Sequence, residues 1–143
     1  MFGFEDQWIR DILAIQNQHV LFLAEGLFMY LPQKAVEGLF KKLSESFSQS
    51  WIVFETANKK YTQGMWKKVV ESKMKRSGGT TAGSAYQFGV NNAKETESFG
   101  KNIKLVEEWS YFEDADIKPK ILWYFRNIRL LTRTQWTIKA TIG

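Results

Sequence analysis

The chain has 143 residues, of which 44% are hydrophobic and 15% aromatic, enough to form the core of one folded domain. Charged residues make up 24% and only two prolines are present, so the composition does not favour disorder. Because the sequence has no cysteine and a single histidine, His19, it excludes disulfides, cysteine nucleophiles and histidine clusters, and we expect no metal site.

The first predicted strand is residues 20–24, a continuous apolar run that follows a polar stretch ending in His19. Such a run is typical of a strand buried on both faces. No apolar stretch of the sequence approaches the roughly 20 residues that a membrane helix needs, and the first residues lack the order of a signal peptide. We therefore expect a soluble, cytoplasmic protein without a membrane partner.

Helices and strands then alternate along the chain. Residues 36–47 carry one apolar stripe at spacings of three and four, which predicts an amphipathic helix. Residues 51–54 form a second apolar run, which predicts a strand, and residues 59–76 again show helical spacing. Alternating strands and helices, with uniformly apolar strand interiors, favour an α/β fold built on a parallel sheet with right-handed crossovers.

The segment 59–76 carries seven of the 20 lysines and arginines, so binding to nucleic acid has to be weighed. The same segment places Trp66, Val69, Val70 and Met74 at helical spacing. That pattern favours a helix that packs through an apolar stripe and turns a solvated basic face outward. We therefore expect no nucleic-acid partner.

The second half of the chain predicts two more strands. Residues 77–85 are glycine, serine, threonine and alanine, a composition typical of a flexible lid or linker. Asn92 and Glu95 resemble a capping box at the start of a short helix. Residues 103–109 predict a strand, and residues 135–142 have the two-residue period of a strand with one exposed face. We expect this last strand to pair antiparallel, at the sheet's edge, with the strand before it.

Residues 20–32 read VLFLAEGLFMYLP, an apolar strand followed by Ala-Glu-Gly and Met-Tyr-Leu. This pattern resembles the signature of the leucine carboxyl methyltransferase family, which includes polyketide O-methyltransferases of the tetracenomycin type. Three further stretches, at residues 6–9, 52–55 and 88–92 with Glu95, fall in the order expected of that family. The resemblance therefore spans nearly the whole chain.

The resemblance implies the C-terminal half of a Rossmann-like S-adenosylmethionine-dependent methyltransferase sheet, as one partial domain over residues 1–143. The chain would supply the fourth to seventh strands, mostly parallel, with the last one antiparallel. In the family, earlier strands carry a glycine-rich turn and an acidic residue that hold the cofactor, and this sequence has neither. The glycines of residues 77–85 follow no predicted strand, so they do not indicate a cofactor cradle.

Candidate site residues lie where predicted strands end, because ligands of open α/β sheets bind beyond the carboxyl ends of the strands. Glu25 ends the first strand, and the family uses the matching glutamate at its cofactor and substrate pocket. We expect Glu25 and Gly26 to contact the cofactor, and Glu25 and Tyr30 to serve catalysis. The alternatives are a hydrogen bond from Glu25 to a helix N-terminus and a place for Tyr30 in the core. Weaker candidates by position are Glu55, Thr56 and Asn58. Trp8 and Asp6 could approach the pocket from the preceding loop, but a structural role is favoured for them.

Two functions follow from these observations. The resemblance implies an enzyme, an S-adenosylmethionine-dependent O-methyltransferase that acts on a carboxylate or hydroxyl of a small-molecule or polyketide-like substrate. The alternative is a non-catalytic, truncated methyltransferase fold that binds no cofactor and associates with itself. An unpaired apolar strand invites pairing with another chain, so we expect a homo-oligomer formed through residues 20–24.

Overall fold

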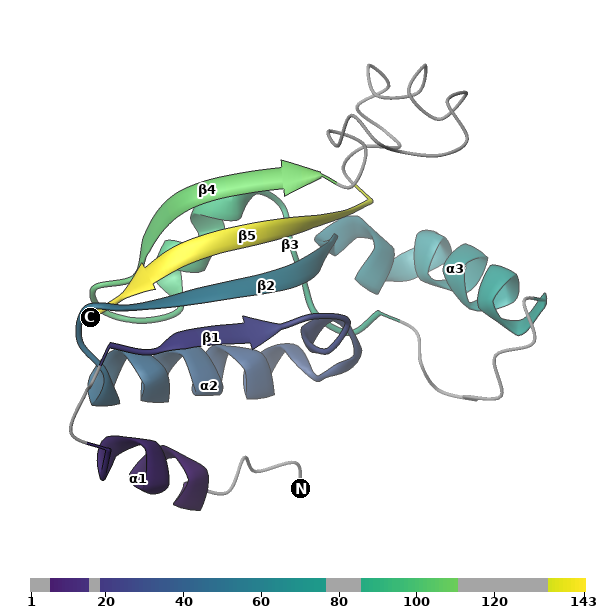
Figure 1. Cartoon of the computed structure of the whole chain (residues 1–143). Coiled ribbons are helices and arrows are strands. Elements are labelled where there is room, and N and C mark those ends of the chain that lie inside the picture. The colour runs from purple at the N-terminus through teal and green to yellow at the C-terminus, as the bar shows by residue number, and fades with distance from the viewer. Residues whose placement is uncertain (1–5, 16–18, 77–85, 111–133) are drawn as a thin grey trace, which may run out of the picture.

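The computed structural model describes residues 6–15, 19–76, 86–110 and 134–143. Within them the chain has an α/β fold with a mixed, open sheet of five strands (Figure 1). The strands are β1 (Leu21–Ala24), β2 (Ser50–Asn58), β3 (Gly89–Val90), β4 (Lys104–Ser110) and β5 (Gln135–Ile142). The helices are α1 (Gln7–Leu13), α2 (Gln33–Ser46), α3 (Gly64–Arg76) and the short 3-10 helices η1 (Phe28–Tyr30), η2 (Lys59–Thr62) and η3 (Ala93–Ser98).

The strand order is β1-β2-β5-β4, with β3 paired to the end of β2. β1 and β3 run parallel to β2, whereas β5 runs antiparallel to both β2 and β4. The predicted span of the last strand, residues 135–142, and its antiparallel pairing with the preceding strand are confirmed. Its predicted place at the edge is wrong, because β5 lies between β2 and β4. An alternating pattern specifies a buried face but not the neighbours on either side.

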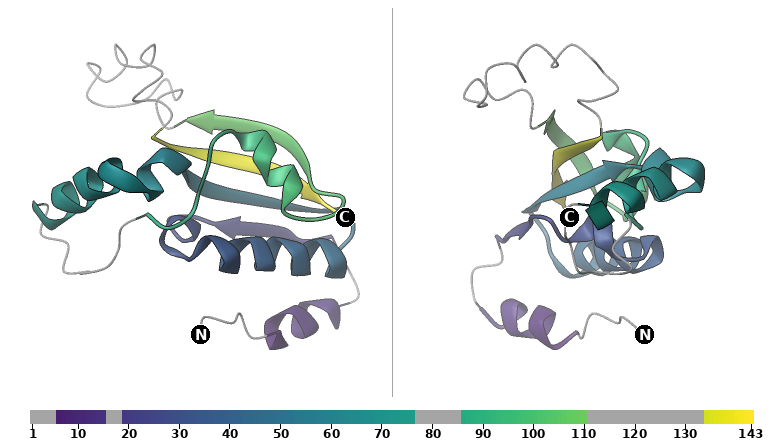
Figure 2. Two further views of the ribbon diagram at one scale, coloured as in Figure 1. Left: turned by 180° about the vertical axis from the view of Figure 1, so that it is seen from behind. Right: turned by 90° about the vertical axis from the view of Figure 1, so that its right-hand side faces the viewer.

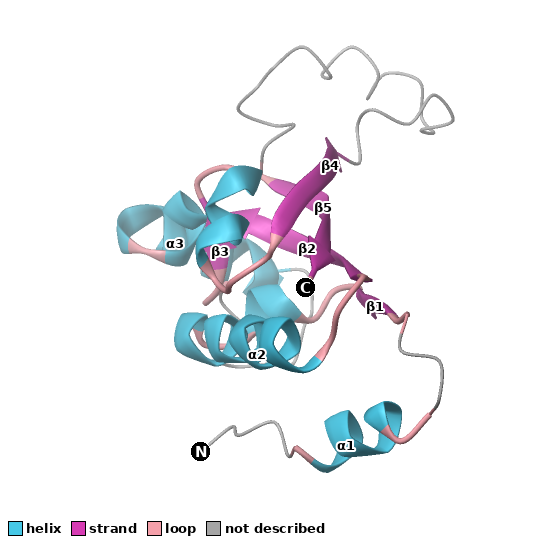
Figure 3. Cartoon of the chain, turned by 90° about the vertical axis from the view of Figure 1, so that its left-hand side faces the viewer, coloured by secondary structure: helices cyan, strands magenta, loops and turns pink. Residues whose placement is uncertain are grey.

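One face of the sheet is covered, and it holds the main core. Helix α2 lies along this face (Figures 2 and 3), and its apolar stripe is buried as its spacing predicts. Phe40 of α2 contacts Phe54 of β2 and Phe99 after η3, with ring centroids 5.1 and 5.6 Å apart. Phe28 and Phe88 complete this aromatic group. Full burial of such a side chain contributes about 1.5–3 kcal/mol, so this face carries much of the stability.

The opposite face is open in the described part of the chain. Leu21 and Leu23 of β1 are 56% and 71% exposed, and Trp51 beside them on β2 is 40% exposed. Only Ala24, which points to the α2 side, is buried in this strand. The prediction that β1 is buried on both faces is therefore wrong for the described residues, because their helices cover one face alone.

The basic segment, residues 59–76, does not form the single packed helix that its spacing predicts. It divides into η2 and α3 at Gly64, whose φ of +63° favours glycine, and α3 extends away from the sheet (Figure 1). Met65 and Trp66 are exposed, so the expected packing is wrong for Trp66. The side chains of Val69, Val70 and Met74 lie outside the described residues, as do residues 77–85.

The predicted cap of the short helix is confirmed. The Asn92 side chain accepts a hydrogen bond from the backbone N–H of Glu95 at 3.1 Å, and the helix that follows is 3-10. Across the described ranges, no helix is both long and apolar enough to cross a membrane.

Candidate functional site

Two glutamates meet where β1 ends beside β2. β1 pairs with β2 as far as Phe54, and β3 begins opposite Ala57, so Glu55 lies in a gap between these two neighbours. The chain leaves β1 through Glu25 and turns at Gly26, where φ is +58°. The N–H of Gly26 donates to Oε2 of Glu55 at 2.8 Å, which ties the end of β1 to β2.

A pocket of about 230 Å³ opens beside the end of β1. Its lining residues are Leu23, Ala24, Glu25, Val53, Phe54, Glu55 and Thr137. The strand alternation places Leu23, Val53 and Thr137 on the open face of the sheet, so the pocket is reached from that side.

The pocket is negatively charged. Its lining includes two carboxylates and no lysine or arginine, and within the described ranges neither Glu25 nor Glu55 forms an ion pair. A cation on the same face, Lys139, lies opposite Val53 and pairs in register with Glu107 of β4. The pocket is therefore suited to a group that is positively charged or that donates hydrogen bonds.

An aromatic cluster lies beyond Glu55 toward the carboxyl end of β2. Tyr86 is buried there with Met29, Ala57 and Tyr61, and the Tyr30 ring lies 5.8 Å from the Tyr86 ring. The side-chain amide of Gln135 donates to the Tyr86 hydroxyl. Burial raises the pKa of Tyr86, and the neighbouring Tyr30 and Glu55 raise it further, against the hydrogen bond from Gln135, which lowers it. The phenol therefore stays neutral at physiological pH.

Comparison with solved structures yields a fold relative. The chain resembles one half of a DUF574 family protein. That protein, from Streptomyces avermitilis, superposes with a TM-score of 0.54 at 13% sequence identity, over 94% of this chain and 52% of that one. The chain therefore spans about half the length of the matched structure, and at this identity the likeness concerns the fold alone. No protein-family model matches the chain, and no curated protein matches it.

The structure brings some of the predicted site residues together and separates others. Glu25 and Glu55 both line the pocket, and Gly26 supports it through its N–H. Tyr30 belongs to η1, does not line the pocket, and packs on Tyr86 behind it. Thr56 is buried on the covered face.

The other weak candidates have structural roles. The Asn58 side chain caps η2 by accepting from the N–H of Lys60 at 3.1 Å. Asp6 forms an ion pair with Lys42, and Trp8 packs edge-on against Phe22 on the α2 side. These contacts agree with the structural interpretation of Asp6 and Trp8, since both are engaged with the α2 side.

Three residues near the site were not predicted from the sequence. Thr137 lines the pocket, and Gln135 donates a hydrogen bond to Tyr86 in the neighbouring aromatic cluster. The two-residue period of β5 places Gln135 and Thr137 on the same face, which was a usable signal. Nothing in that period indicates that this face meets the end of β2, because the strand order decides that contact.

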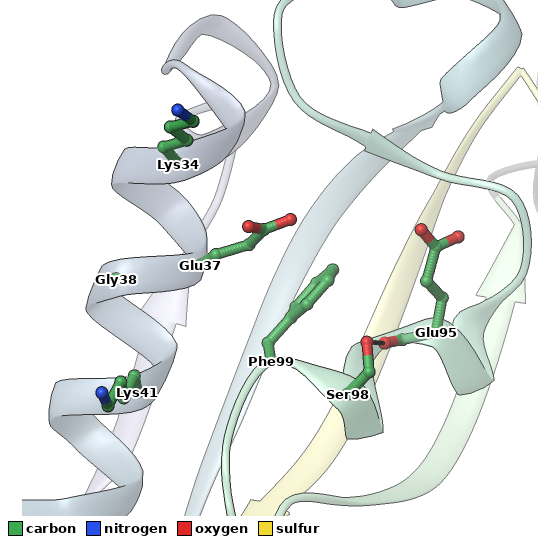
Figure 4. A pocket seen from close by; sticks show the side chains of 7 residues that line it. All are labelled: Lys34, Glu37, Gly38, Lys41, Glu95, Ser98 and Phe99. Atoms are coloured by element: carbon green, nitrogen blue, oxygen red, sulfur yellow. Dashed lines mark hydrogen bonds between the residues drawn. The ribbon is translucent and has the colours of Figure 1, made fainter.

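A larger groove of about 440 Å³ lies between α2 and η3 (Figure 4). Glu37 points from α2 toward η3, with Lys34 and Lys41 one turn before and after it. Glu95 on the other wall already binds Lys59 and the N–H of Asn91, both at 2.9 Å. Because its charges are mixed and this carboxylate is already engaged, the groove is a weaker candidate than the pocket at the strand ends.

Proposed function

We propose that this chain is the acceptor-side part of an S-adenosylmethionine-dependent O-methyltransferase, with the pocket between Glu25 and Glu55 as its reaction site. The observation that carries the proposal is the pair of glutamates, without ionic partners among the described residues, that meet where β1 ends beside β2, near the carboxyl edge of these parallel strands. This is the edge at which open α/β sheets bind ligands. The sequence pattern at residues 20–32, which resembles that of known methyltransferases, supports the same assignment.

The charge of the residues that line the pocket is complementary to the charge of the cofactor. S-adenosylmethionine, when bound, supplies an electrophilic methyl group on a positively charged sulfur. Glu25 and Glu55 would attract such a charge, since among the described residues no cation lines the pocket to compete for them. The pocket, at about 230 Å³, is smaller than sites that enclose a whole drug-sized ligand, roughly 300–1,000 Å³. It would therefore hold the reacting end of the cofactor.

The chain's contribution to such a reaction is positioning. Leu23 and Val53 give the pocket an apolar floor on the open face of the sheet, and Glu25 and Glu55 would orient the charged and hydrogen-bonding groups above it. Holding two reactants in line supplies a large part of the rate in a direct displacement. Tyr30 and Tyr86 pack on each other behind the pocket and do not line it.

Calorimetric titration of S-adenosylmethionine into the purified chain tests the proposal. We expect binding that Glu25→Gln weakens about fivefold, the effect of losing one exposed charge interaction of roughly 1 kcal/mol. Glu45→Gln, an exposed glutamate on the far turn of α2, is the matched control and should leave binding unchanged. Absence of binding at millimolar cofactor would contradict the proposal for this chain.

A second candidate is a non-catalytic fold that associates with itself through β1. The specific observation is that Leu21 and Leu23 are exposed on an edge strand, and residues 20–24 contain no charge to discourage pairing. Sedimentation velocity at rising concentration should then show a dimer, and Leu23→Lys should remain monomeric with an unchanged circular dichroism spectrum. A wild-type chain that stays monomeric at high micromolar concentration would exclude this candidate.

A further inference from the structure

The two glutamates of the pocket are held differently. The Glu25 side chain is exposed, whereas Glu55 is half-buried in the gap between β1 and β3. Oε2 of Glu55 accepts the Gly26 N–H at 2.8 Å, and its Oε1 accepts no bond from the described residues. Glu55 therefore presents one oriented, available acceptor oxygen to the pocket.

Apart from Glu25, the described side chains next to Glu55 are uncharged. Val53 precedes it on the same face of β2, Thr137 lies opposite it on β5, and the buried, neutral Tyr86 lies beyond it. Among the described residues no lysine or arginine lines the pocket, and Lys139, the cation on the same face, lies opposite Val53 and pairs in register with Glu107. An anionic group placed here would face like charges without compensation, which is unfavourable in a partly desolvated site.

We infer that Glu55 selects the methyl acceptor: it accepts a hydrogen bond from a neutral hydroxyl and repels a carboxylate. The inference rests on the proposed function, and it chooses between the two acceptor classes that the sequence leaves open. The apolar floor of Leu23 and Val53 would suit an apolar ring that carries this hydroxyl.

The same placement lets Glu55 take up the hydroxyl proton. As the hydroxyl oxygen bonds to the methyl carbon, the carbon–sulfur bond breaks and its electron pair stays on sulfur. The hydroxyl proton passes to the Glu55 carboxylate, so charge and atoms balance. A carboxylate acceptor is already deprotonated and would gain nothing from this residue.

The test compares two probes of the same shape, 2-naphthol and 2-naphthoate, at neutral pH. The readout is the backbone amide signal of Gly26 in proton–nitrogen correlation spectra, because that N–H is bonded to Glu55. We expect 2-naphthol to shift this signal at lower concentration than 2-naphthoate. Glu55→Gln, which keeps an oxygen for Gly26, should reduce the preference about threefold, and Glu45→Gln should preserve it.

Three results would overturn the inference: naphthoate binding as well as naphthol, a preference that survives Glu55→Gln, or no shift of Gly26 with either probe. Titration of S-adenosylmethionine into the same samples keeps the two proposals apart. If the chain prefers 2-naphthol but does not bind S-adenosylmethionine, the result counts against the methyltransferase function. If the chain binds S-adenosylmethionine but shows no preference for 2-naphthol, the result counts against the role of Glu55.

Discussion

The two faces of the sheet differ in what they leave to solvent. On the α2 face, Phe40, Phe54 and Phe88 are at most 1% exposed and pack ring against ring. On the other face, Leu21 and Leu23 remain largely exposed, and the candidate pocket opens among them. The covered face therefore specifies the fold, and the open face is available for a ligand or a second chain.

The largest contrast is expected from removing one apolar side chain on each face. Phe54→Ala leaves a cavity in a core that cannot collapse around it, and we expect a loss of about 3–5 kcal/mol in the free energy of unfolding. Leu23→Ala, its counterpart one register pair away on β1, should change it by less than about 0.5 kcal/mol. Urea unfolding measures both, and an equally large loss for Leu23→Ala would mean that the open face is covered in solution.

Two glycines provide the next contrast. A Cβ added to Gly89 would lie 2.7 Å from the carbonyl oxygen of Ala57, so Gly89→Ala should disturb the β2–β3 pairing and cost about 1–3 kcal/mol. Gly38 on α2 has open space around it, and Gly38→Ala should gain about 0.5–1 kcal/mol from helix propensity. Thermal unfolding checks the opposite signs; a stable Gly89→Ala protein would show that β3 can shift away from β2.

The cap of η3 should have a smaller effect. Asn92→Ala removes the side-chain bond to the Glu95 N–H and should destabilise the protein by about 1 kcal/mol. Lys94→Ala, an exposed residue of the same helix, is the control and should stay within about 0.5 kcal/mol. Chemical denaturation of both variants measures the difference, which would vanish if the cap does not support the covered face.

The smallest effect concerns pH. Burial by itself raises the pKa of Glu95, but the Asn91 N–H and the Lys59 ammonium outweigh it and hold the pKa below 4.5, the value of a free glutamate. The ionised form therefore stabilises the fold above that pH, and this stability is lost as pH falls through the lowered pKa. Glu95→Gln should flatten the acid decline of stability, measured by unfolding between neutral and acid pH. Glu45→Gln should retain the wild-type slope.

Much of the fold follows from local patterns. The periods of residues 36–47 and 135–142, and the apolar runs before Glu25 and Glu55, specify the α2 stripe and three strands of the sheet. The rule that ligands bind at strand ends also indicates both glutamates. These features are encoded over a few residues, because side-chain direction repeats with the period of each element.

The tertiary structure alone decided which elements became neighbours. β5 entered the sheet between β2 and β4, which brought Thr137 and Gln135 to the end of β2 although they are about 80 residues away in sequence. It also left one side of β1 open, where the sequence indicated burial on both. Strand order and the covering of a face depend on contacts between distant segments, and no local period of the sequence records them.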